Sequence, residues 1–334
     1  MSTTTNGLKR RRFIQAVGIT AFSPFTLAAP CTGPQAPYGD FPRSSFGERS
    51  TAEQVTEGLD LQGKTAVITG CNSGLGLESM RVLVKRGAHV IGTARTAEKA
   101  EKACASVDGK ATPVVLELTD FNSARACAKT IRDMQIPLDI LMCNAGIMAL
   151  PELQLVNGLE KQFVVNHLGH FLFTTELLEP VRRAKSGRIV ILSSCAHHNA
   201  PEVGIDFDNL DGSKSYSGWT AYGRSKLANG LFAAELARRL AGTDTTANSL
   251  HPGVIKTNLG RYLPEQKPAD DEVFNKTIPQ GAATQCYVAG NPIPAAISGQ
   301  YFSDCNPVAA RPLMYDEALA KRLWSVSEEL VGAA

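Results

Sequence analysis

The feature that most constrains the fold is a regular alternation of short apolar runs with longer helical stretches. The apolar runs cover residues 64–69, 89–93, 113–118, 138–143, 188–192 and 246–250. Predicted helices lie between and after them, at residues 74–86, 97–107, 122–134, 158–178 and 220–240. Apolar runs that are each followed by a helix are typical of parallel strands buried on both faces. The pattern therefore predicts an α/β fold with one doubly wound parallel sheet of about seven strands and helices on both faces.

The composition excludes two classes of protein. The 334-residue chain is 43% hydrophobic and 20% charged, which is too apolar and too weakly charged for an intrinsically disordered chain. Its 34 basic and 32 acidic side chains give a formal net charge of +2. Because this balance offers no basic footprint, we expect no nucleic-acid partner.

A glycine-rich loop joins the first predicted strand to the first predicted helix, at residues 69–76. Gly70 can make a tight turn, Gly74 lets the backbone approach a pyrophosphate, and Gly76 allows close packing of helix on strand. The start of the helix offers free N–H groups and the positive end of its dipole to phosphates. This strand–loop–helix context predicts a dinucleotide site, and the alternative is a structural turn without a ligand. The predicted pyrophosphate-binding residues are Gly70, Asn72, Ser73, Gly74, Leu75 and Gly76.

The end of the second predicted strand indicates which dinucleotide is bound. An acidic residue at this point would bind the ribose 2′-hydroxyl and repel a 2′-phosphate, but no acid occurs before Glu98. Arg95 stands there instead and is placed to pair with a 2′-phosphate. The sequence therefore favours NADP over NAD, unless Arg95 is an ordinary solvated surface residue.

A tyrosine and a lysine four residues apart predict an acid–base pair. Tyr222 and Lys226 share one face of a predicted helix. A neighbouring cation stabilises a phenolate and lowers its pKa toward the neutral range. Ser193 and Ser194 follow the preceding strand, where a hydroxyl could hold a substrate oxygen beside the phenol.

Together these motifs resemble the short-chain dehydrogenase/reductase family, in its compact single-domain branch. The resemblance covers about residues 59–302 and rests on the TGxxxGxG spacing of residues 69–76, on residues 144–146, and on Ser194, Tyr222 and Lys226. It implies a Rossmann-type sheet and a metal-free oxidoreductase that uses NADP, or less readily NAD. The glycine spacing differs from that of the extended branch, which contains the sugar-nucleotide epimerases.

The resemblance also implies roles for single residues. Ser194, rather than Ser193, would orient and polarise the substrate C–O group, and Tyr222 would donate or accept the proton. Lys226 would tune Tyr222 and bind the nicotinamide ribose, and Asn166 would hold a water in the proton relay. The further cofactor residues that it implies are Asn144, Ala145 and Gly146 in the cleft, Asp120 at the adenine edge, and Pro252, Gly253 and Thr257 on the nicotinamide side.

Four stretches resemble retinol dehydrogenase and WW-domain oxidoreductase relatives: residues 166–172, 224–229, 251–253 and 322–327. The resemblance implies hydride transfer between nicotinamide and an alcohol or carbonyl carbon of a mostly apolar small molecule. One alternative is a catalytically silent NADP-binding sensor. Another is a light-dependent C=C reductase, although those proteins carry an insertion near the tyrosine–lysine helix that this chain lacks. The resemblance implies a homo-oligomer formed through the predicted helices at residues 158–178 and 220–240, and the alternative is a monomer, as in some relatives of this subgroup.

An N-terminal segment precedes the alternating pattern. A basic cluster at residues 9–12 is followed by a weakly apolar run to Ala29, which resembles a twin-arginine (Tat) export signal. The run is too short and too interrupted for a membrane-spanning helix. We therefore predict a signal segment at residues 1–30, a proline-rich linker and lead-in at 31–58, and the NADP-binding domain at 59–334. The predicted location is the periplasm, and the alternative is a cytoplasmic enzyme with a disordered basic tail.

Two long segments interrupt the pattern near the predicted site, at residues 196–219 and 259–278. Loops of this length in a compact domain are usually functional or mobile. We expect them to cap the substrate. Five aromatic side chains could supply an apolar wall, and the alternative is that they only anchor the surface loops: Phe207, Tyr216, Trp219, Tyr262 and Phe274. His167 and His170, together with His197 and His198, could suggest a metal site, but the eight cysteines form no CxxC motif and no ligand set converges on these histidines. Helix packing is the favoured interpretation, and no metal site is predicted.

Overall fold

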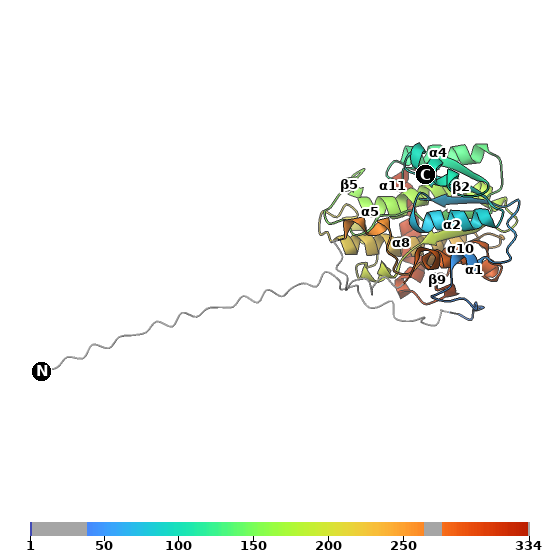
Figure 1. Cartoon of the computed structure of the whole chain (residues 1–334). Helices are drawn as coiled ribbons and strands as arrows, with labels where there is room; N and C mark the ends of the chain where they lie inside the picture. Colours follow the sequence, from blue (N-terminus) through green and yellow to red (C-terminus); the bar gives the residue numbers. More distant parts are fainter. Residues whose placement is uncertain (2–38, 264–275, 333–334) are drawn as a thin grey trace.

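An eight-stranded sheet runs through the middle of the molecule (Figure 1). The structure is a computed structural model that describes Met1, residues 39–263 and residues 276–332. The strand order is β10-β9-β8-β7-β4-β1-β2-β3, and every neighbouring pair is parallel except β9 and β10. The strands are β1 (Thr65–Thr69), β2 (His89–Ala94), β3 (Ala111–Val115), β4 (Ile140–Cys143), β7 (Arg188–Leu192), β8 (Thr246–His251), β9 (Tyr301–Ser303) and β10 (Asn306–Pro307). The predicted doubly wound parallel sheet is confirmed.

The strand order reverses direction beside β1. From β1 the chain builds outward through β2 to β3, and then returns to the other side of β1 as β4. In parallel α/β sheets, ligands bind outside the carboxyl ends of the strands at such a reversal. The glycine loop and residues 144–146 follow β1 and β4 directly, so the fold brings them to the same crevice.

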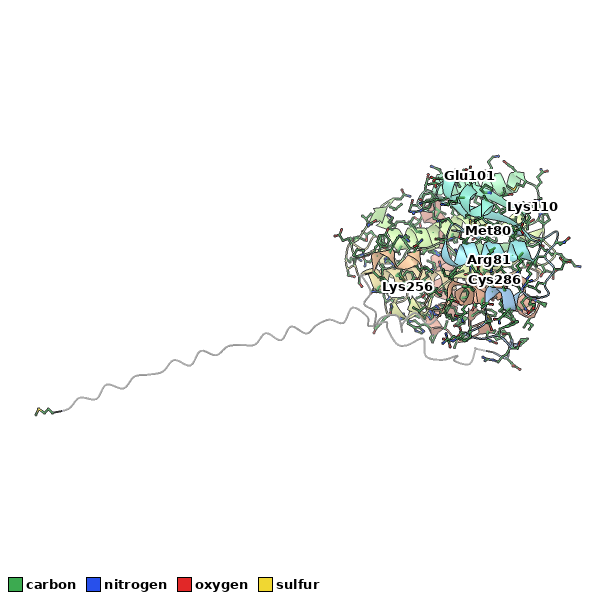
Figure 2. All side chains as sticks on the ribbon, in the orientation of Figure 1. Met80, Arg81, Glu101, Lys110, Lys256 and Cys286 are labelled. Atoms are coloured by element: carbon green, nitrogen blue, oxygen red, sulfur yellow. The ribbon has the colours of Figure 1, made fainter. Side chains whose placement is uncertain are left out.

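Helices cover both faces of this sheet and enclose two apolar clusters. The first face carries α1 (Ala52–Val55), α2 (Gly74–Lys85), α3 (Ala97–Ala105), α9 (Ile278–Gly281) and α10 (Ala283–Gly290). Figure 2 labels Met80 on α2 and Cys286 on α10, two buried members of this cluster. The second face carries α4 (Phe121–Asp133), α6 (Gly169–Glu176), α7 (Leu178–Arg182), α8 (Gly218–Arg239) and α11 (Glu317–Val331).

The helix expected at residues 158–178 is divided into several elements. A hairpin of β5 (Leu155–Val156) and β6 (Leu159–Glu160) comes first, and α5 (Lys161–Phe163) begins only after it. The Glu160 carboxylate ends the hairpin and starts α5, because it accepts hydrogen bonds from the backbone N–H groups of Gln162 and Phe163. A π-helix (Val164–Leu168) then joins α5 to α6. π-helical turns are rare and are frequent at functional sites.

Helix α11 packs across α8 and α6 within a single chain. Trp324 of α11 packs edge-on against Phe171, with ring centroids 5.0 Å apart. The Arg239 guanidinium carbon lies 3.9 Å from the Trp324 ring centroid. The chain's own C-terminal helix therefore covers part of the two-helix face that was expected to form an oligomer. Within the described residues, none of the helices has the length and apolar character needed to cross a bilayer.

Residues of the expected linker contact the sheet domain. Ser44 donates a hydrogen bond to the Cys305 carbonyl, at 2.9 Å, and Phe46 packs edge-on against Tyr287. Ala52 and Val55 of α1 are buried in the first cluster. Helix α1 thus belongs to the packed body, and the domain boundary at residue 59 stays a prediction. The twin-arginine-like segment lies outside the described residues.

Candidate functional site

A cleft of about 460 Å³ opens at the carboxyl ends of the central strands. Its walls come from residues that follow β1, β2, β3, β4, β7 and β8, and from α8. The predicted residues that line it are Gly70, Asn72, Ser73, Gly74, Leu75, Arg95, Asn144, Ala145, Gly146, Tyr222, Lys226, Pro252 and Thr257. The predicted residues outside its lining are Gly76, Asp120, Asn166, Ser194 and Gly253. The sheet thus brings most of the predicted residues to one edge, although they are spread over almost 190 positions of the chain, from 70 to 257.

Two glycines of the glycine loop, Gly70 and Gly76, leave no space for a side chain. Gly70 has a φ of +69°, and a Cβ added there would lie 2.9 Å from the Cβ of Ala145. A Cβ added to Gly76 would lie 2.3 Å from the Gly70 carbonyl oxygen. Ser73 precedes α2 without capping it through its side chain. The first N–H groups of α2 are therefore available to an anion in the cleft.

Thr69 ties the glycine loop to the loop after β4. Its Oγ1 accepts hydrogen bonds from the backbone N–H groups of Asn144, at 2.9 Å, and Ala145, at 3.0 Å. The Asn144 side chain returns a hydrogen bond to the Thr69 carbonyl, at 2.9 Å. These contacts fix the two loops on either side of the strand reversal relative to each other.

The lining of the cleft is rich in basic side chains. It contains five basic side chains and one carboxylate. Arg95 follows β2 directly, lines the cleft and is exposed. The other basic lining residues are Lys99, Lys161, Lys226 and Arg261.

The carboxylate at the cleft is Glu117 rather than the expected Asp120. Asp120 is exposed and caps α4, where it accepts a hydrogen bond from the Asn122 N–H at 2.9 Å. Glu117 lines the cleft and accepts hydrogen bonds from the N–H and the hydroxyl of Thr119. The sequence signal that could have identified Glu117 is its position two residues after the end of β3.

Tyr222 and Lys226 lie one helical turn apart on α8, and each is only 4% exposed. Lys226 Nζ lies 5.5 Å from the centroid of the Tyr222 ring and donates a hydrogen bond to the Leu192 carbonyl at 3.0 Å. Burial lowers the pKa of Lys226 to about 8. Burial also raises the pKa of Tyr222, and a hydrogen bond with the Ser194 side chain opposes that rise. The Tyr222 phenol, the Ser194 hydroxyl and the Lys226 ammonium therefore lie close together at the edge of the cleft.

The two serines after β7 have different surroundings. Ser193 is buried, and its hydroxyl donates to the Lys226 carbonyl at 2.7 Å. The Ser194 hydroxyl faces Tyr222 and accepts a hydrogen bond from the Ala196 N–H at 3.1 Å. His197 supports Ser194 by contacting its carbonyl oxygen through Nδ1 at 2.7 Å.

Asn166 lies in the π-helix behind the cleft, and its amide group is engaged by the protein. Oδ1 accepts from the Ile147 N–H, and the two Nδ2 protons go to the Ile147 carbonyl and the Ser225 hydroxyl, each bond at 2.9 Å. The expected relay water would therefore have to bind an oxygen of Asn166, since both amide protons are used.

A buried lysine that sequence reasoning missed supports the loop after β8. Lys276 donates a hydrogen bond to the Pro252 carbonyl at 3.3 Å and pairs with Asp304. Thr257 accepts from the Leu259 N–H and so caps the short 3₁₀ turn η4 (Asn258–Tyr262). The partners of Lys276 are 24 and 28 residues away, so no local pattern marks it.

The expected aromatic wall is only partly present among the described residues. Trp219 stands edge-on to Tyr222 with ring centroids 6.1 Å apart, and Tyr262 lines the cleft. The Tyr216 hydroxyl donates to the Leu150 carbonyl at 2.8 Å. Phe207 was placed in this wall wrongly, because it packs on the second apolar cluster under the Arg322 guanidinium. Phe274 lies outside the described residues.

No group of three or more His, Cys, Asp and Glu side chains that could hold a metal occurs in the described part of the chain. His167 bonds Ser327 at 2.8 Å and His170 bonds Thr69 at 2.9 Å, so both histidines have protein partners. Six described cysteines are free and buried, whereas Cys195 is disulfide-bonded.

Residues 64–207 match the family model for short chain dehydrogenase. The chain is 41% identical to the short-chain dehydrogenase TIC 32 B, chloroplastic, of Brassica napus over 305 residues, which span 86% of this chain and 95% of that protein. It is 40% identical to human retinol dehydrogenase 14 over 296 residues, which span 81% of this chain and 87% of that protein.

Two solved structures are similar to this chain in fold and in sequence. An uncharacterized protein from Mycobacterium paratuberculosis matches with a TM-score of 0.69 and 34% identity, over 83% of this chain and 97% of that one. The NADP active-site complex of Pseudomonas aeruginosa RhlG matches with a TM-score of 0.59 and 25% identity, over 73% of this chain and 95% of that one. The chain therefore belongs to the short-chain dehydrogenase/reductase family.

Proposed function

We propose that this oxidoreductase is an NADP-dependent alcohol dehydrogenase or carbonyl reductase. The observation that carries the proposal is the buried Tyr222 phenol, which meets the Ser194 hydroxyl and lies beside the Lys226 ammonium. These groups stand at the carboxyl edge of a parallel sheet, where a substrate can approach them from the cleft. Such a set can hold a C–O group and move one proton to or from its oxygen.

The cleft fits a phosphorylated dinucleotide. The uncapped start of α2 and the glycine loop would hold the pyrophosphate, since Gly70 and Gly76 leave no space for side chains. The excess of basic lining residues suits a cofactor with several negative charges. Arg95 would pair with a 2′-phosphate, which favours NADP, and Glu117 would face the adenine edge. When bound, the nicotinamide exchanges a hydride with the substrate carbon.

The protein groups divide the proton chemistry among themselves. A neutral Tyr222 hydroxyl is the proton donor in the reduction direction, and burial keeps it neutral by raising its pKa. In the oxidation direction a phenolate must form, and the positive charge of Lys226 stabilises it. Lys226 Nζ uses one proton for the Leu192 carbonyl and keeps two for Tyr222 and the ribose hydroxyls. Ser194 would orient the substrate oxygen.

We propose a small, mostly apolar substrate with an alcohol or carbonyl group. The cleft lining includes the apolar side chains of Ile147, Val165 and Leu259, and Trp219 stands edge-on to the Tyr222 ring. An apolar wall with a few polar groups at one end is the usual form of a site for such molecules. The name of human retinol dehydrogenase 14 points to an apolar alcohol of this kind as the first substrate to test.

The test uses the purified full chain with NADPH or NADH and a panel of retinoid, steroid and aromatic carbonyl compounds. We expect NADPH oxidation with at least one apolar aldehyde or ketone, and the reverse reaction with the matching alcohol and NADP⁺. NADPH binding without oxidation on the whole panel would favour the silent sensor, and turnover that requires light would favour the C=C reductase.

A Tyr222→Phe variant separates the mechanism from the general function. Removing the phenolic hydroxyl should lower kcat at least about 100-fold, because a positioned acid–base group contributes about 10²–10⁴-fold. Tyr287→Phe is the matched control, since Tyr287 is a buried tyrosine of α10 on the other face of the sheet. Full activity in Tyr222→Phe would show that the proposed mechanism is wrong.

The cellular location of the protein is a separate proposal. Residues 1–30 are proposed as a twin-arginine-like export segment, with a cytoplasmic location as the alternative. N-terminal sequencing of the protein from its native cells, together with fractionation, distinguishes a processed exported form from an unprocessed cytoplasmic one.

A further inference from the structure

His170 is a buried histidine that the proposed mechanism does not use. It lies on α6, is 1% exposed, and is not part of the cleft lining. Its ring contacts two groups that belong to the site: Nε2 lies 2.9 Å from Thr69 Oγ1, and Nδ1 lies 3.1 Å from the Asn166 carbonyl oxygen. The ring therefore joins the end of β1 to the π-helix.

The partners of Thr69 determine where the proton of this ring lies. Thr69 Oγ1 already accepts two hydrogen bonds, from the N–H groups of Asn144 and Ala145. A hydroxyl has two lone pairs and one proton, so its own proton must be donated to His170 Nε2. His170 Nε2 is consequently unprotonated, and Nδ1–H donates to the Asn166 carbonyl. The opposite tautomer would direct an N–H at an oxygen whose lone pairs are both used.

The environment of the ring keeps it neutral. Burial, together with the positive charge of Lys226, lowers the pKa of His170 to about 4, although the hydrogen bond to Asn166 opposes the change. Its polar contacts in the structure are a hydroxyl and a carbonyl, with no carboxylate among them. At neutral pH the His170 ring is therefore uncharged, with Nδ1–H as its hydrogen-bond donor and Nε2 as its hydrogen-bond acceptor.

Hydrogen bonds donated in the same direction continue from the Asn166 side chain toward helix α8. The Asn166 side chain donates to the Ser225 hydroxyl, and Ser225 in turn donates to the Tyr222 carbonyl at 2.7 Å. A path of protein groups thus runs from the floor of the cofactor cleft, through Thr69, His170 and Asn166, to the helix that carries the catalytic tyrosine.

We propose that His170 is a positioning residue. It holds the end of β1 and the loop after β4, where the cofactor would bind, at the distance from helix α8 that the reaction needs. The inference rests on the proposed oxidoreductase function. It assigns His170 neither proton transfer with the substrate nor a metal. Without the ring, the Thr69 hydroxyl and the Asn166 carbonyl lose their shared partner, and the two halves of the site can move apart. A displacement of about 1 Å can cost about 100-fold in rate.

The first test compares His170→Phe with His167→Phe. His167 is the matched control, because it is equally buried one helical turn earlier, but its Nε2 bonds Ser327 of α11, which does not line the cleft. His170→Phe should raise the Kd for NADPH about tenfold and lower kcat about 10- to 100-fold. His167→Phe should lower the melting temperature and leave kcat and the NADPH Kd within about twofold. A folded His170→Phe whose kcat and NADPH Kd equal those of the wild type would overturn the inference.

The second test acts at the other end of the same hydrogen bond. Thr69→Val removes the hydroxyl and should reproduce the kinetic losses of His170→Phe, and Thr69→Ser should recover most of them. Because the two residues act as one unit, the Thr69→Val/His170→Phe double variant should lose no more than the worse single variant. Losses that multiply in the double variant would show that Thr69 and His170 act separately, against the inference.

The third test needs neither turnover nor a variant. Nitrogen NMR of histidine-labelled wild-type protein should show His170 with a protonated Nδ1 and a bare Nε2 at all pH values above about 5. A protonated Nε2 would overturn the assigned direction, even where His170→Phe fails to fold. If none of the tested substrates supports NADPH oxidation by the wild type, the proposed function fails. The tautomer and the NADPH Kd still decide the role of His170 in that case.

Discussion

Replacing the buried Lys226 by methionine should abolish turnover and at the same time make the folded protein more stable. The side chain is 4% exposed, and the one hydrogen bond that its Nζ makes in the structure is to an uncharged group, the Leu192 carbonyl. Methionine has a similar length and carries no charge. The variant therefore separates the cost of burying an ammonium from the benefit that the ammonium gives to the reaction.

The expected gain follows from the pKa of Lys226. Burial lowers that pKa from 10.5 to about 8, and one pKa unit corresponds to about 1.4 kcal/mol, so the buried charge costs the fold about 3 kcal/mol at pH 7. Methionine loses one hydrogen bond worth about 1 kcal/mol. The Leu192 carbonyl keeps its other hydrogen bond, from Asn229 at 2.9 Å. Lys226→Met should therefore raise the free energy of unfolding by about 2 kcal/mol at pH 7.

The pH dependence provides the sharper test. The folded-state pKa lies below the unfolded-state value, so the unfolded chain binds more protons between about pH 8 and pH 10.5. The cost of burying Lys226 is complete below that window and disappears as the pH rises through it. At pH 9.5 only about 1 kcal/mol of the cost remains, and the two proteins should be almost equally stable.

Urea unfolding of wild type and variant without cofactor, at pH 7 and pH 9.5, measures this difference directly. Lys129→Met is a suitable control, because it makes the same substitution on the surface of α4, where the side chain is 68% exposed and its charge is not buried. A Lys226→Met protein that is less stable than the wild type at pH 7, or a difference that does not change with pH, would refute the reasoning.

Two further predictions concern other parts of the molecule. Trp324→Ala should lower the free energy of unfolding by about 3–5 kcal/mol, because it removes a buried indole that holds α11 on the sheet domain; a loss below about 1 kcal/mol in urea unfolding would contradict the packing role of α11. Arg95→Glu should raise the KM for NADPH about 10- to 100-fold and change the KM for NADH much less, since a charge-assisted contact contributes about 1.5–3 kcal/mol. Lys102→Glu on the exposed side of α3 makes the same charge change and should leave the ratio of the two KM values unaltered.

The parts of the fold that sequence predicts best are those where one physical rule dominates. Strands such as β4 and β7 are buried along their whole length, so an uninterrupted apolar run reveals them. The glycine loop is equally visible, because the close contacts of Gly70 and Gly76 require glycine and the spacing is local. The spacing of Tyr222 and Lys226 follows from the helical repeat alone.

The remaining features depend on contacts that the local pattern does not contain. The β5–β6 hairpin interrupts an apolar stretch that reads as a helix, and Glu160 determines where α5 begins. The third strand ends at Val115, three residues before the expected end, so the acid that faces the cleft is Glu117 and not Asp120. The contact between Thr69 and His170 spans 101 positions of the chain, which no short motif reveals.

The π-helix also limits which changes in chain length the protein can accept. A π-helical turn holds one residue more than an α-helical turn, so deletion of a single residue in Val164–Leu168 would let the segment close into a continuous α-helix. One residue corresponds to a rotation of about 100° about the helix axis. Either Asn166 or His170 would then point away from its partners, although both residues would still be present. In this segment, an in-frame deletion that removes no functional residue is therefore expected to be as damaging as the loss of one.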